Sequence, residues 1–306
     1  MAAPVVLLSG GTGGAKLARG LLDEVGADLA VVANTGDDVE VYGAHVSPDP
    51  DLVTFWLADR IDARGWGLDG DTFAVMDGLR EIGEDVWFNL GDRDLAIGVQ
   101  RARRLAEGGT LTECLADLAS AFGVGARVLP MSDGPVRTRV RGGGRWWPLQ
   151  EWLLRGGEAA GPVEEVYFEG SDAAFVTPAV LEAIASARAI VIGPSNPVIS
   201  ISPILALPGM RDALRAADAP VVAVSPIVGG EVLKGPTAAF MAAWGLGADT
   251  AGVAKAYEGL LDGLVTDERA DAGVPLLESD TRMDTPAARR RVATEVLGFA
   301  DALRAP

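Results

Sequence analysis

Cysteine and histidine are almost absent from this chain of 306 residues, which contains only Cys114 and His45. A single cysteine allows no intrachain disulfide and no cysteine-rich metal site. A single histidine leaves no multi-histidine zinc site and nearly rules out a Ser-His-Asp triad. The groups left for catalysis are carboxylates, backbone amides and Lys or Arg, with a hard cation such as Mg²⁺ or Mn²⁺ as a further candidate.

Positive charge is also scarce, with 26 Lys and Arg against 43 Asp and Glu and a formal net charge of −17. Such a field repels phosphate backbones, so we expect no nucleic-acid partner. No apolar run approaches the roughly 20 residues of a membrane-spanning helix, so we expect no membrane partner. The N-terminus lacks the basic region and cleavage signal of a secretory peptide, which predicts a cytoplasmic protein.

Short apolar runs alternate with longer helical patterns along the chain. Four such runs are Pro4–Leu8, Leu29–Ala33, Ala189–Ile192 and Pro220–Val224. Runs that are apolar throughout are typical of a parallel sheet covered on both faces. Polar loops rich in Gly and Pro follow these runs, at the edge where open α/β sheets bind ligands. The pattern predicts one α/β domain over residues 1–306, with a doubly wound, mostly parallel, Rossmann-like sheet.

Residues 51–165 have a different, mainly helical pattern. We expect this segment to be an insertion of helices and a hairpin over the ligand edge of the sheet. The elements predicted there are helices at Asp51–Arg64, Asp71–Ile82, Asp94–Ala106 and Thr110–Phe122, strands at Arg127–Leu129 and Val136–Val140, a hairpin at Val140–Trp147 and a turn at Gly156–Gly161. A last helix is predicted at Pro286–Leu303, packed on the sheet.

The loop Ser9–Lys16 carries four glycines around one threonine, and a helix pattern begins near Ala15. Glycines let backbone amides approach an anion, and a helix start adds partial positive charge. The loop is not a Walker A motif, because Ala15 precedes Lys16 and Leu17 follows it. Lys16 also occupies the third glycine position of the dinucleotide fingerprint. We predict a phosphate-binding loop, with a plain strand-to-helix turn as the alternative.

Four carboxylates follow the second apolar run, at Asp37, Asp38, Asp49 and Asp51. Mg²⁺ is typically bound by one or two carboxylates together with substrate phosphates. These acids therefore predict a cation site beside the phosphate loop. The alternative is structural, since Asp49 and Asp51 can cap the next helix and Asp37 or Asp38 can hold a turn.

Two further loops hold candidate binding residues. In Gly91–Asp94, Arg93 can clamp a polar ligand through its planar guanidinium, although the flanking acids can equally be helix N-caps. In Gly193–Pro197, Ser195 and Asn196 can read a base or ribose, or the loop can be only a rigid turn. Weaker candidates are Lys234 for a phosphate and Trp146, Trp147 and Trp152 for a ring, where a solvated lysine and core tryptophans are the alternatives.

Taken together, these stretches resemble the 2-phospho-L-lactate transferase family, which acts in the biosynthesis of the deazaflavin coenzyme F-420. The resemblance runs in order from about residue 5 to about residue 270, which is far more specific than a single glycine loop. The matching motifs are Leu8–Leu17, Asn34–Asp38, Val46–Asp51, Gly65–Gly67, Trp87–Ala96, Leu129–Asp133, Gly193–Pro197, Ile199–Leu205, Ser225–Gly230 and Lys234–Pro236.

The resemblance implies a reaction in which a guanosine diphosphate-activated phospho-acid is joined to 7,8-didemethyl-8-hydroxy-5-deazariboflavin and GMP leaves. The acid is phospholactate, or phosphoenolpyruvate in some branches of the family. The family also implies Mg²⁺, with Mn²⁺ as a substitute, and a homodimer. Such a reaction needs charge neutralisation and positioning more than a nucleophilic side chain, which agrees with the scarcity of His and Cys.

Carried over residue by residue, the resemblance implies roles for particular side chains. Asp37 and Asp51 are the expected catalytic and metal-binding acids. The expected substrate-binding residues are Asp51, Asp92, Arg93, Met131 and Ser132, and the expected nucleotide-binding residues are Gly10, Gly11, Thr12, Gly13, Gly14, Lys16, Ser195 and Asn196. The chain departs from the usual family pattern at Leu52, Ile97, Gly98 and Gly134. These departures lie near the expected acceptor pocket, so they concern the choice of substrate more than the reaction class.

A second function class remains open at this point. The glycine loop and the sheet are also similar to the gluconeogenesis-factor family, which implies a non-catalytic regulator that binds a nucleotide sugar or a dinucleotide. The motifs Gly91–Asp94 and Pro130–Asp133 belong to the transferase pattern and favour the enzyme. Because the loop Ser9–Lys16 does not match the Walker A motif, a P-loop kinase or GTPase is disfavoured.

Overall fold

The computed structural model describes residues 3–156, 161–232 and 235–304. Its centre is a sheet of seven strands whose neighbours all pair in parallel. The strands, in their order across the sheet, are β14 (Leu276–Glu278), β13 (Gly263–Thr266), β10 (Val221–Val224), β9 (Ala189–Ile192), β1 (Val5–Ser9), β2 (Leu29–Ala33) and β5 (Arg127–Pro130). The predicted parallel α/β sheet is confirmed.

The order of the strands has a consequence for ligand binding. The chain builds the sheet outward from β1 through β2 to β5, then returns to β9 beside β1 and continues through β10, β13 and β14. This is the doubly wound order of Rossmann-like folds, and its direction reverses between β1 and β9. Ligands of such sheets bind in the crevice at that reversal.

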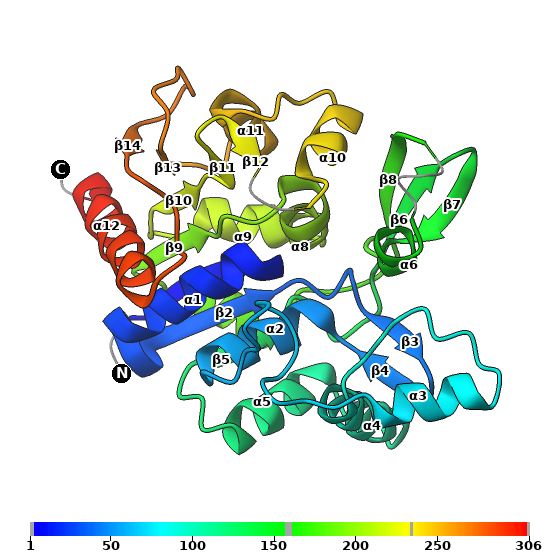
Figure 1. Cartoon of the computed structure of the whole chain (residues 1–306). Coiled ribbons are helices and arrows are strands. Elements are labelled where there is room, and N and C mark those ends of the chain that lie inside the picture. Colours follow the sequence, from blue (N-terminus) through cyan, green and yellow to red (C-terminus); the bar gives the residue numbers. More distant parts are fainter. Residues whose placement is uncertain (1–2, 157–160, 233–234, 305–306) are drawn as a thin grey trace.

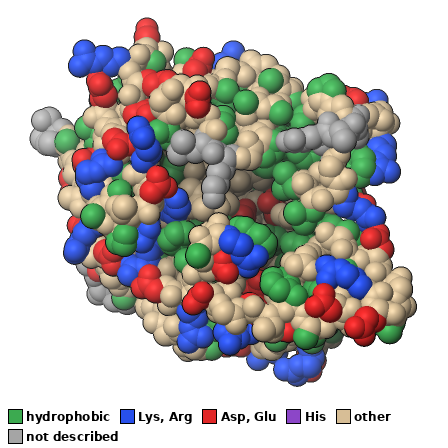
Figure 2. Space-filling model, in the orientation of Figure 1, with side chains coloured by type: hydrophobic (Ala, Val, Ile, Leu, Met, Phe, Trp, Pro, Cys, Tyr) green, Lys and Arg blue, Asp and Glu red, His purple; other side chains and the backbone are tan. Residues whose placement is uncertain are grey.

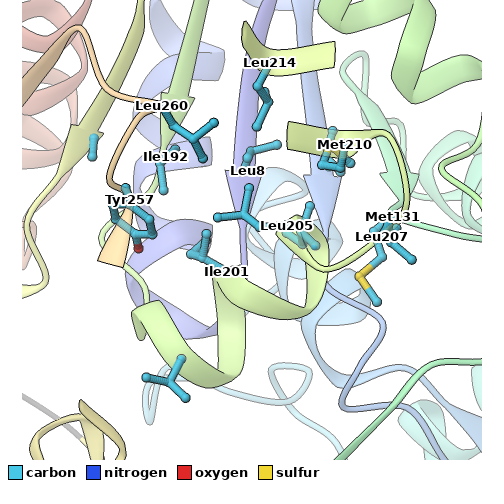
Figure 3. Packing of buried hydrophobic residues seen from close by; sticks show 14 of the residues in the cluster. Leu8, Met131, Ile192, Ile201, Leu205, Leu207, Met210, Leu214, Tyr257 and Leu260 are labelled. Carbon is cyan, nitrogen blue, oxygen red and sulfur yellow. The ribbon is translucent and has the colours of Figure 1, made fainter. Parts of the chain in front are cut away.

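The two faces of the sheet are covered by separate hydrophobic cores, as the alternation of residues along the strands requires. In β1, Val5 and Leu7 face one core, and Val6 and Leu8 face the other. The first core packs under α1 (Gly11–Val25), α2 (Pro48–Leu57), α5 (Leu111–Ala121) and α12 (Pro286–Arg304). The second packs under α7 (Pro178–Ala185), the π-helix Pro197–Ile201, α8 (Ser202–Leu205), α9 (Met210–Ala216), α10 (Thr237–Ala243) and α11 (Thr250–Ala256). Figure 3 shows Leu8 and Ile192 of the sheet facing Ile201 and Leu205 in this second core.

Two smaller units flank the sheet (Figure 1). One combines the hairpin β3 (Val39–Val41) and β4 (Ala44–Val46) with α3 (Ala74–Glu81) and α4 (Asp92–Ala106) around a core of its own. The other is a three-stranded antiparallel sheet of β6 (Arg137–Gly142), β7 (Arg145–Pro148) and β8 (Val163–Glu169) with α6 (Leu149–Leu154). A two-stranded hairpin of β11 (Ile227–Val228) and β12 (Glu231–Val232) follows β10, and a short 3₁₀ turn at Gly26–Asp28 follows α1.

The segment 51–165 is not one uninterrupted insertion. Its strand β5 is the edge strand of the central sheet, and α2 packs against α1 in the main body. The segment supplies only part of each flanking unit, because β3 and β4 precede it and β8 extends beyond it. The predicted hairpin forms with Gly143 and Gly144 at its tip, both at positive φ, whereas residues 157–160 of the predicted turn at Gly156–Gly161 lie outside the described residues.

Several predicted helix boundaries are wrong, including the start predicted at Asp71, since α3 begins at Ala74. The helix predicted at Asp51–Arg64 begins at Pro48 and ends at Leu57, because proline suits the first turn and Asp59 adopts a positive φ of 53° that a helix cannot continue. Helix α1 begins at Gly11, four residues before Ala15, so most of the predicted glycine loop is the first helical turn. No helix within the described residues combines the length and apolar character needed to cross a membrane.

Candidate functional site

A cavity of about 590 Å³ opens at the reversal point between β1 and β9. Figure 2 shows this face of the molecule hollowed near its centre, with acidic side chains visible in the hollow. The cavity is lined by the start of α1, the loops after β2, β9 and β10, and the segment before α12. Its polar lining includes Thr12, Lys16, Asp37, Asp49, Gln150, Ser195, Asn196, Ser200, Ser225, Thr237, Thr281 and Asp284.

The predicted phosphate-binding residues meet at this cavity. Gly10, Gly11, Thr12, Gly13 and Lys16 all line it. Gly13 needs to be glycine because a Cβ there would lie 2.0 Å from the carbonyl oxygen of Pro194. The first turn of α1 therefore packs closely against the loop after β9 and borders the cavity, and a helix N-terminus at a cavity is an arrangement that binds anions.

Gly14 and Ser195 hold the two sides of the reversal point together. A Cβ on Gly14 would lie 2.3 Å from Ser9 Oγ and 2.8 Å from Ser195 Oγ, so Gly14 is packed beneath the cavity and does not line it. The Ser195 hydroxyl donates to the Gly10 carbonyl oxygen and accepts from the Gly10 amide at 3.3 Å. The side chain of Asn196 lies at the cavity and accepts from the amides of Val198 and Ile199, which it caps.

Lys16 lies in the cavity wall and forms an ion pair with Asp284, at 3.1 Å between Nζ and Oδ1. Asp284 is 75% exposed, so this pair is weakly stabilising. A more strongly charged anion, such as a diphosphate, can replace the Asp284 carboxylate on Lys16 at little cost.

Two buried carboxylates, Asp37 and Asp49, share one amide group at the floor of the cavity. Asn34 Nδ2 lies 3.0 Å from Asp37 Oδ1 and 2.9 Å from Asp49 Oδ2. The other oxygen of Asp49 accepts from the amide of Gly11 at 2.6 Å, so Asp49 lies at the N-terminus of α1. The second oxygen of Asp37 has only the 3.5 Å contact from Gln150 Nε2. Among the described contacts, no Lys or Arg neutralises either acid.

The electrostatics of this pair follow from its burial. Burial, and then the charge of Asp49, raises the pKa of Asp37 well above its usual range. Burial also raises the pKa of Asp49 to about 6, against the hydrogen bonds from Asn34 and Gly11. Two neighbouring carboxylates that lack a cationic side chain favour a bound cation or a bound proton.

Asp51 lies in the first turn of α2, on the side opposite Asp49, and does not line the cavity. Its carboxylate forms a two-pronged ion pair with Arg101 of α4, with 3.0 Å between Oδ2 and Nη1. Arg101 is 1% exposed and also donates to the carbonyl oxygen of His45 at 3.0 Å. Asp94 lies near Asp51 in this region, and burial followed by the Asp51 charge raises the pKa of Asp94 to about 7.

Asp38 lies between the two sides and has its own partners. It accepts from Ser47 Oγ at 2.7 Å and pairs with His45 Nε2 at 3.0 Å. Its charge raises the pKa values of Asp37, Asp49 and Asp51 alike, so all four acids are neighbours. Burial lowers the pKa of His45, but hydrogen bonds with Asp38 and Glu40 outweigh burial and raise it to about 9.

Asp92 and Arg93 lie at the exposed start of α4. Asp92 caps α3, because its carboxylate accepts from Thr72 Oγ1 and from the amides of Ala74 and Val75. In turn, the Asp71 carboxylate, which lies before α3, accepts from the amide of Arg93 in the first turn of α4. The N-cap alternative for Asp92 is therefore correct for a neighbouring helix, and the Arg93 guanidinium remains exposed to solvent, with one 3.4 Å contact to the Asp69 carbonyl oxygen.

Met131 and Ser132 are completely buried and line none of the cavities described in the structure. Met131 packs in the core of the second face (Figure 3). Ser132 Oγ accepts from the amide of Gly134 and shapes the turn after β5. Both residues therefore lie behind the surface that a substrate would touch.

The three candidate tryptophans pack against neighbouring side chains of the protein. Trp152 belongs to the core, edge-on to Phe240 at 5.2 Å between ring centroids, and Trp146 packs edge-on to Tyr167. Trp147 is half-buried beneath Arg145. Lys234 lies outside the described residues.

Sequence reasoning missed Asn34 as the bridging group, and it included Asp49 among the four candidate cation-binding acids without separating it from Asp51. A signal was present, because Asn34 immediately follows β2 within the motif that holds Asp37. Arg101 carried no signal, since nothing in its helical surroundings marks it as a partner of Asp51. Within the described ranges, no group of three His, Cys, Asp or Glu residues is arranged to hold a metal ion by itself.

Comparison with known proteins shows the family to which the chain is similar. Residues 5–293 match the family model described as 2-phospho-L-lactate transferase CofD. The chain is 41% identical to the 2-phospho-L-lactate transferase of Methanosarcina mazei, over 87% of each chain. It is also 41% identical to the phosphoenolpyruvate transferase of Kitasatospora aureofaciens, over 90% of this chain and 88% of that protein.

Solved structures share the fold at lower identity. A crystal structure of protein BH3568 from Bacillus halodurans has a TM-score of 0.61 at 18% identity, covering 97% of this chain and all of that chain. A second structure of the same protein, described as a member of the UPF0052 family, has a TM-score of 0.63 at 17% identity, over 96% of this chain and 99% of that one. At this identity the likeness concerns the fold alone.

Proposed function

The chain belongs to the 2-phospho-L-lactate transferase CofD family and is a transferase, and from that premise we propose the substrates and the roles of its residues. We propose that it transfers a phospho-acid from a guanosine diphosphate-linked donor to 7,8-didemethyl-8-hydroxy-5-deazariboflavin, with release of GMP. The donor acid is phospholactate, phosphoenolpyruvate or a close analogue. The observation that carries this proposal is the juxtaposition of the open first turn of α1 and the Asp37–Asp49 pair in one cavity.

The cavity suits a nucleoside diphosphate from end to end. The amides of Thr12 and Gly13 and the Nζ of Lys16 offer a positively polarised surface for phosphates, whereas the Gly11 amide already donates to Asp49. The lining also contains apolar side chains, including Pro226, Val228, Val232 and Met283, which suit a flat base or an apolar acid group. We propose that the diphosphate lies along α1 and Lys16.

The residues present also fit a divalent cation. Asp37 and Asp49 are oxygen ligands without a cationic partner among their described contacts, and two carboxylates with substrate phosphates make a typical Mg²⁺ site. We therefore propose Asp37 and Asp49 as the carboxylates that hold Mg²⁺ or Mn²⁺, with Asp51 held away by Arg101. Such a cation, when bound, polarises phosphoryl oxygens and lowers the pKa of a coordinated hydroxyl.

In the proposed reaction, a hydroxyl oxygen of the acceptor bonds to the phosphorus that carries the acid. The bond from that phosphorus to the bridging oxygen breaks, and GMP leaves with the electron pair. The hydroxyl proton passes to a carboxylate, for which we propose Asp37, because its Oδ2 lines the cavity floor with only the 3.5 Å contact from Gln150. Gly10–Gly13 and Lys16 hold the departing phosphate in place.

We propose that the acceptor approaches from the side of α4. Asp51, Asp94 and the exposed guanidinium of Arg93 lie on that side. Asp38 is a neighbour both of Asp51 and of the Asp37–Asp49 pair at the cavity. Arg93 can present its planar fork to the ring or ribityl group of the deazariboflavin, and Asp51 can accept hydrogen bonds while Arg101 fixes its position. We further propose a homodimer, which light scattering on the purified protein tests directly.

Mass spectrometry of the products tests the reaction. The protein is incubated with Mg²⁺, the deazariboflavin and, in separate vials, guanosine-linked phospholactate, phosphoenolpyruvate and phosphoglycerate. We expect one donor to give a new deazaflavin phosphodiester together with one equivalent of GMP. An Asp37→Asn protein serves as the inactive control. Absence of a phosphodiester and of GMP with every donor would contradict the proposed function.

A further inference from the structure

Asn34 has an unusual set of partners at the floor of the cavity. It is completely buried at the end of β2. Its Nδ2 is within hydrogen-bond distance of Asp37 Oδ1, Asp49 Oδ2 and, at 3.3 Å, the carbonyl oxygen of Ile199. Its Oδ1 accepts from the amide of Gly36 at 2.8 Å, which fixes the orientation of the amide plane. One side-chain group thus joins the loops that follow β2 and β9 to the helix that carries Asp49.

The orientation of this amide has a simple electrostatic reason. The amide nitrogen carries two protons and faces two carboxylates, so each carboxylate can receive one hydrogen bond. Asp37 and Asp49 would otherwise face each other in a buried space, where like charges repel strongly. A single neutral donor between them sets their spacing.

The neutrality of this donor matters as much as its geometry. The neighbouring acids Asp51 and Asp38 are matched by Arg101 and His45, which satisfy their charge within the protein. Asn34 satisfies hydrogen bonds at Asp37 and Asp49 and leaves their negative charge uncompensated. A lysine or arginine at this place would repel a cation, whereas an amide keeps the site attractive to one.

We propose that Asn34 is a positioning residue that sets the spacing of the Asp37–Asp49 pair for a divalent cation. This inference rests on the cation site in the proposed function. It goes beyond that function by assigning the site's affinity to a residue that does not itself carry charge. Residues that orient metal ligands typically contribute 10- to 100-fold to metal affinity.

The first experiment measures Mn²⁺ binding by electron paramagnetic resonance in the presence of GDP. Asn34→Leu removes both donors at similar size, and Asn34→Ser keeps one. We expect Mn²⁺ affinity to fall by about 10- to 100-fold in Asn34→Leu and by less in Asn34→Ser. GDP affinity measured without metal should change little, because Asn34 is not among the cavity-lining residues. Asn89→Leu is the matched control, since Asn89 is exposed and bonds only to Arg80.

A second experiment uses the unaltered Asn34 and does not depend on a folded variant. The chain has only three asparagines, Asn34, Asn89 and Asn196, so ¹⁵N-asparagine labelling yields three side-chain NH₂ groups, each with its own pair of proton signals. Asn89→Ser and Asn196→Ser assign two of them, and the third belongs to Asn34. With GDP present, substoichiometric Mn²⁺ should broaden the Asn34 signal first and leave the Asn89 signal sharp.

The outcomes separate the two claims. If the parent protein binds no Mn²⁺ with GDP, both the cation site and the role of Asn34 are overturned. If the parent binds Mn²⁺ and folded Asn34→Leu binds it equally well, only the role of Asn34 fails. If the Asn34 amide signal is no more broadened than that of Asn89, the cation lies elsewhere and the inference is likewise overturned.

Discussion

The two carboxylates in the first turn of α2, Asp49 and Asp51, have opposite electrostatic surroundings. Asp51 faces Arg101, which supplies a full positive charge and two hydrogen bonds. Asp49, two residues earlier, faces the neutral amides of Asn34 and Gly11 beside another carboxylate, Asp37. Asp51 has a cationic partner within the fold, whereas the Asp37–Asp49 pair has none among the described residues and would be neutralised by a bound cation or a proton. The comparison indicates which buried acid serves the architecture and which serves binding.

The largest expected effect comes from breaking the Asp51–Arg101 side. Arg101→Met leaves Asp51 as a buried, unpaired charge, which should lower the free energy of unfolding by about 3–5 kcal/mol. Urea denaturation measures this loss. Arg103→Met is the control on the same helix, because Arg103 pairs at the surface with Glu107 and its loss should cost less than about 1 kcal/mol.

A double variant sharpens this prediction. Replacing both partners, in Asp51→Leu/Arg101→Met, removes the unpaired charge and should recover most of the stability. Activity should not recover with it if Asp51 contacts the acceptor as proposed. An Arg101→Met protein as stable as the parent in urea would show that the pair does not hold α4 on α2.

Breaking the other side should reduce activity without reducing stability. Asp37→Asn removes one of two like charges in a buried space, so the unfolding free energy should stay level or rise. Its kcat should fall by about 100-fold or more, because the cation site and the proton acceptor are lost together. Steady-state kinetics and urea denaturation of the same preparation check both halves.

Asp38→Asn is the neighbouring control for that variant. Asp38 pairs with His45 and Ser47, so its replacement should cost stability and have the smaller effect on kcat. Turnover of Asp37→Asn at the parental rate, or full activity of the parent in excess EDTA, would contradict the roles given to Asp37.

A smaller effect is expected at the phosphate end of the cavity. Lys16→Met removes the cation that faces the proposed diphosphate, and GDP affinity should fall by about tenfold. Thermal stability should hardly change, because the pair of Lys16 with exposed Asp284 is weak. Asp284→Asn is the matched control and should leave GDP affinity equal or higher by freeing Lys16. Isothermal titration calorimetry that shows equal GDP affinity in parent and Lys16→Met would place the phosphates elsewhere.

The smallest expected effect is a pH dependence at His45. Its pKa is about 9 in the folded protein and about 6.5 in an unfolded chain. A raised pKa means that protonation stabilises the fold, fully below pH 6.5 and progressively less as the pH rises through 9. The difference in Tm between the parent and His45→Gln should therefore be largest near pH 6 and shrink towards pH 10. A constant difference across that range would show that His45 does not titrate with folding.

Much of the fold followed from local pattern. Runs such as Leu29–Ala33 and Ala189–Ile192 are apolar at every position, which only a strand buried on both faces requires, and both became central strands. The start of α2 was placed three residues late, because Pro48 opens the helix while the acids after it resemble a loop. The helix ends at Leu57 because Asp59 adopts a positive φ, and an aspartate residue by itself does not predict that conformation.

The sequence by itself determined the parallel sheet, the polar loops at one of its edges and the motifs that identify the family. Tertiary structure alone decided which acids share a cavity. Successive helical residues are turned by about 100°, so Asp49 and Asp51 must point to nearly opposite sides of α2. Which of the two sides meets α1 and which meets α4 depends on packing between segments some 40 to 50 residues apart in the chain. Local pattern carries no record of such distant contacts, and for that reason the pairing of Arg101 with Asp51, and of Asn34 with Asp49, became visible only in the folded chain.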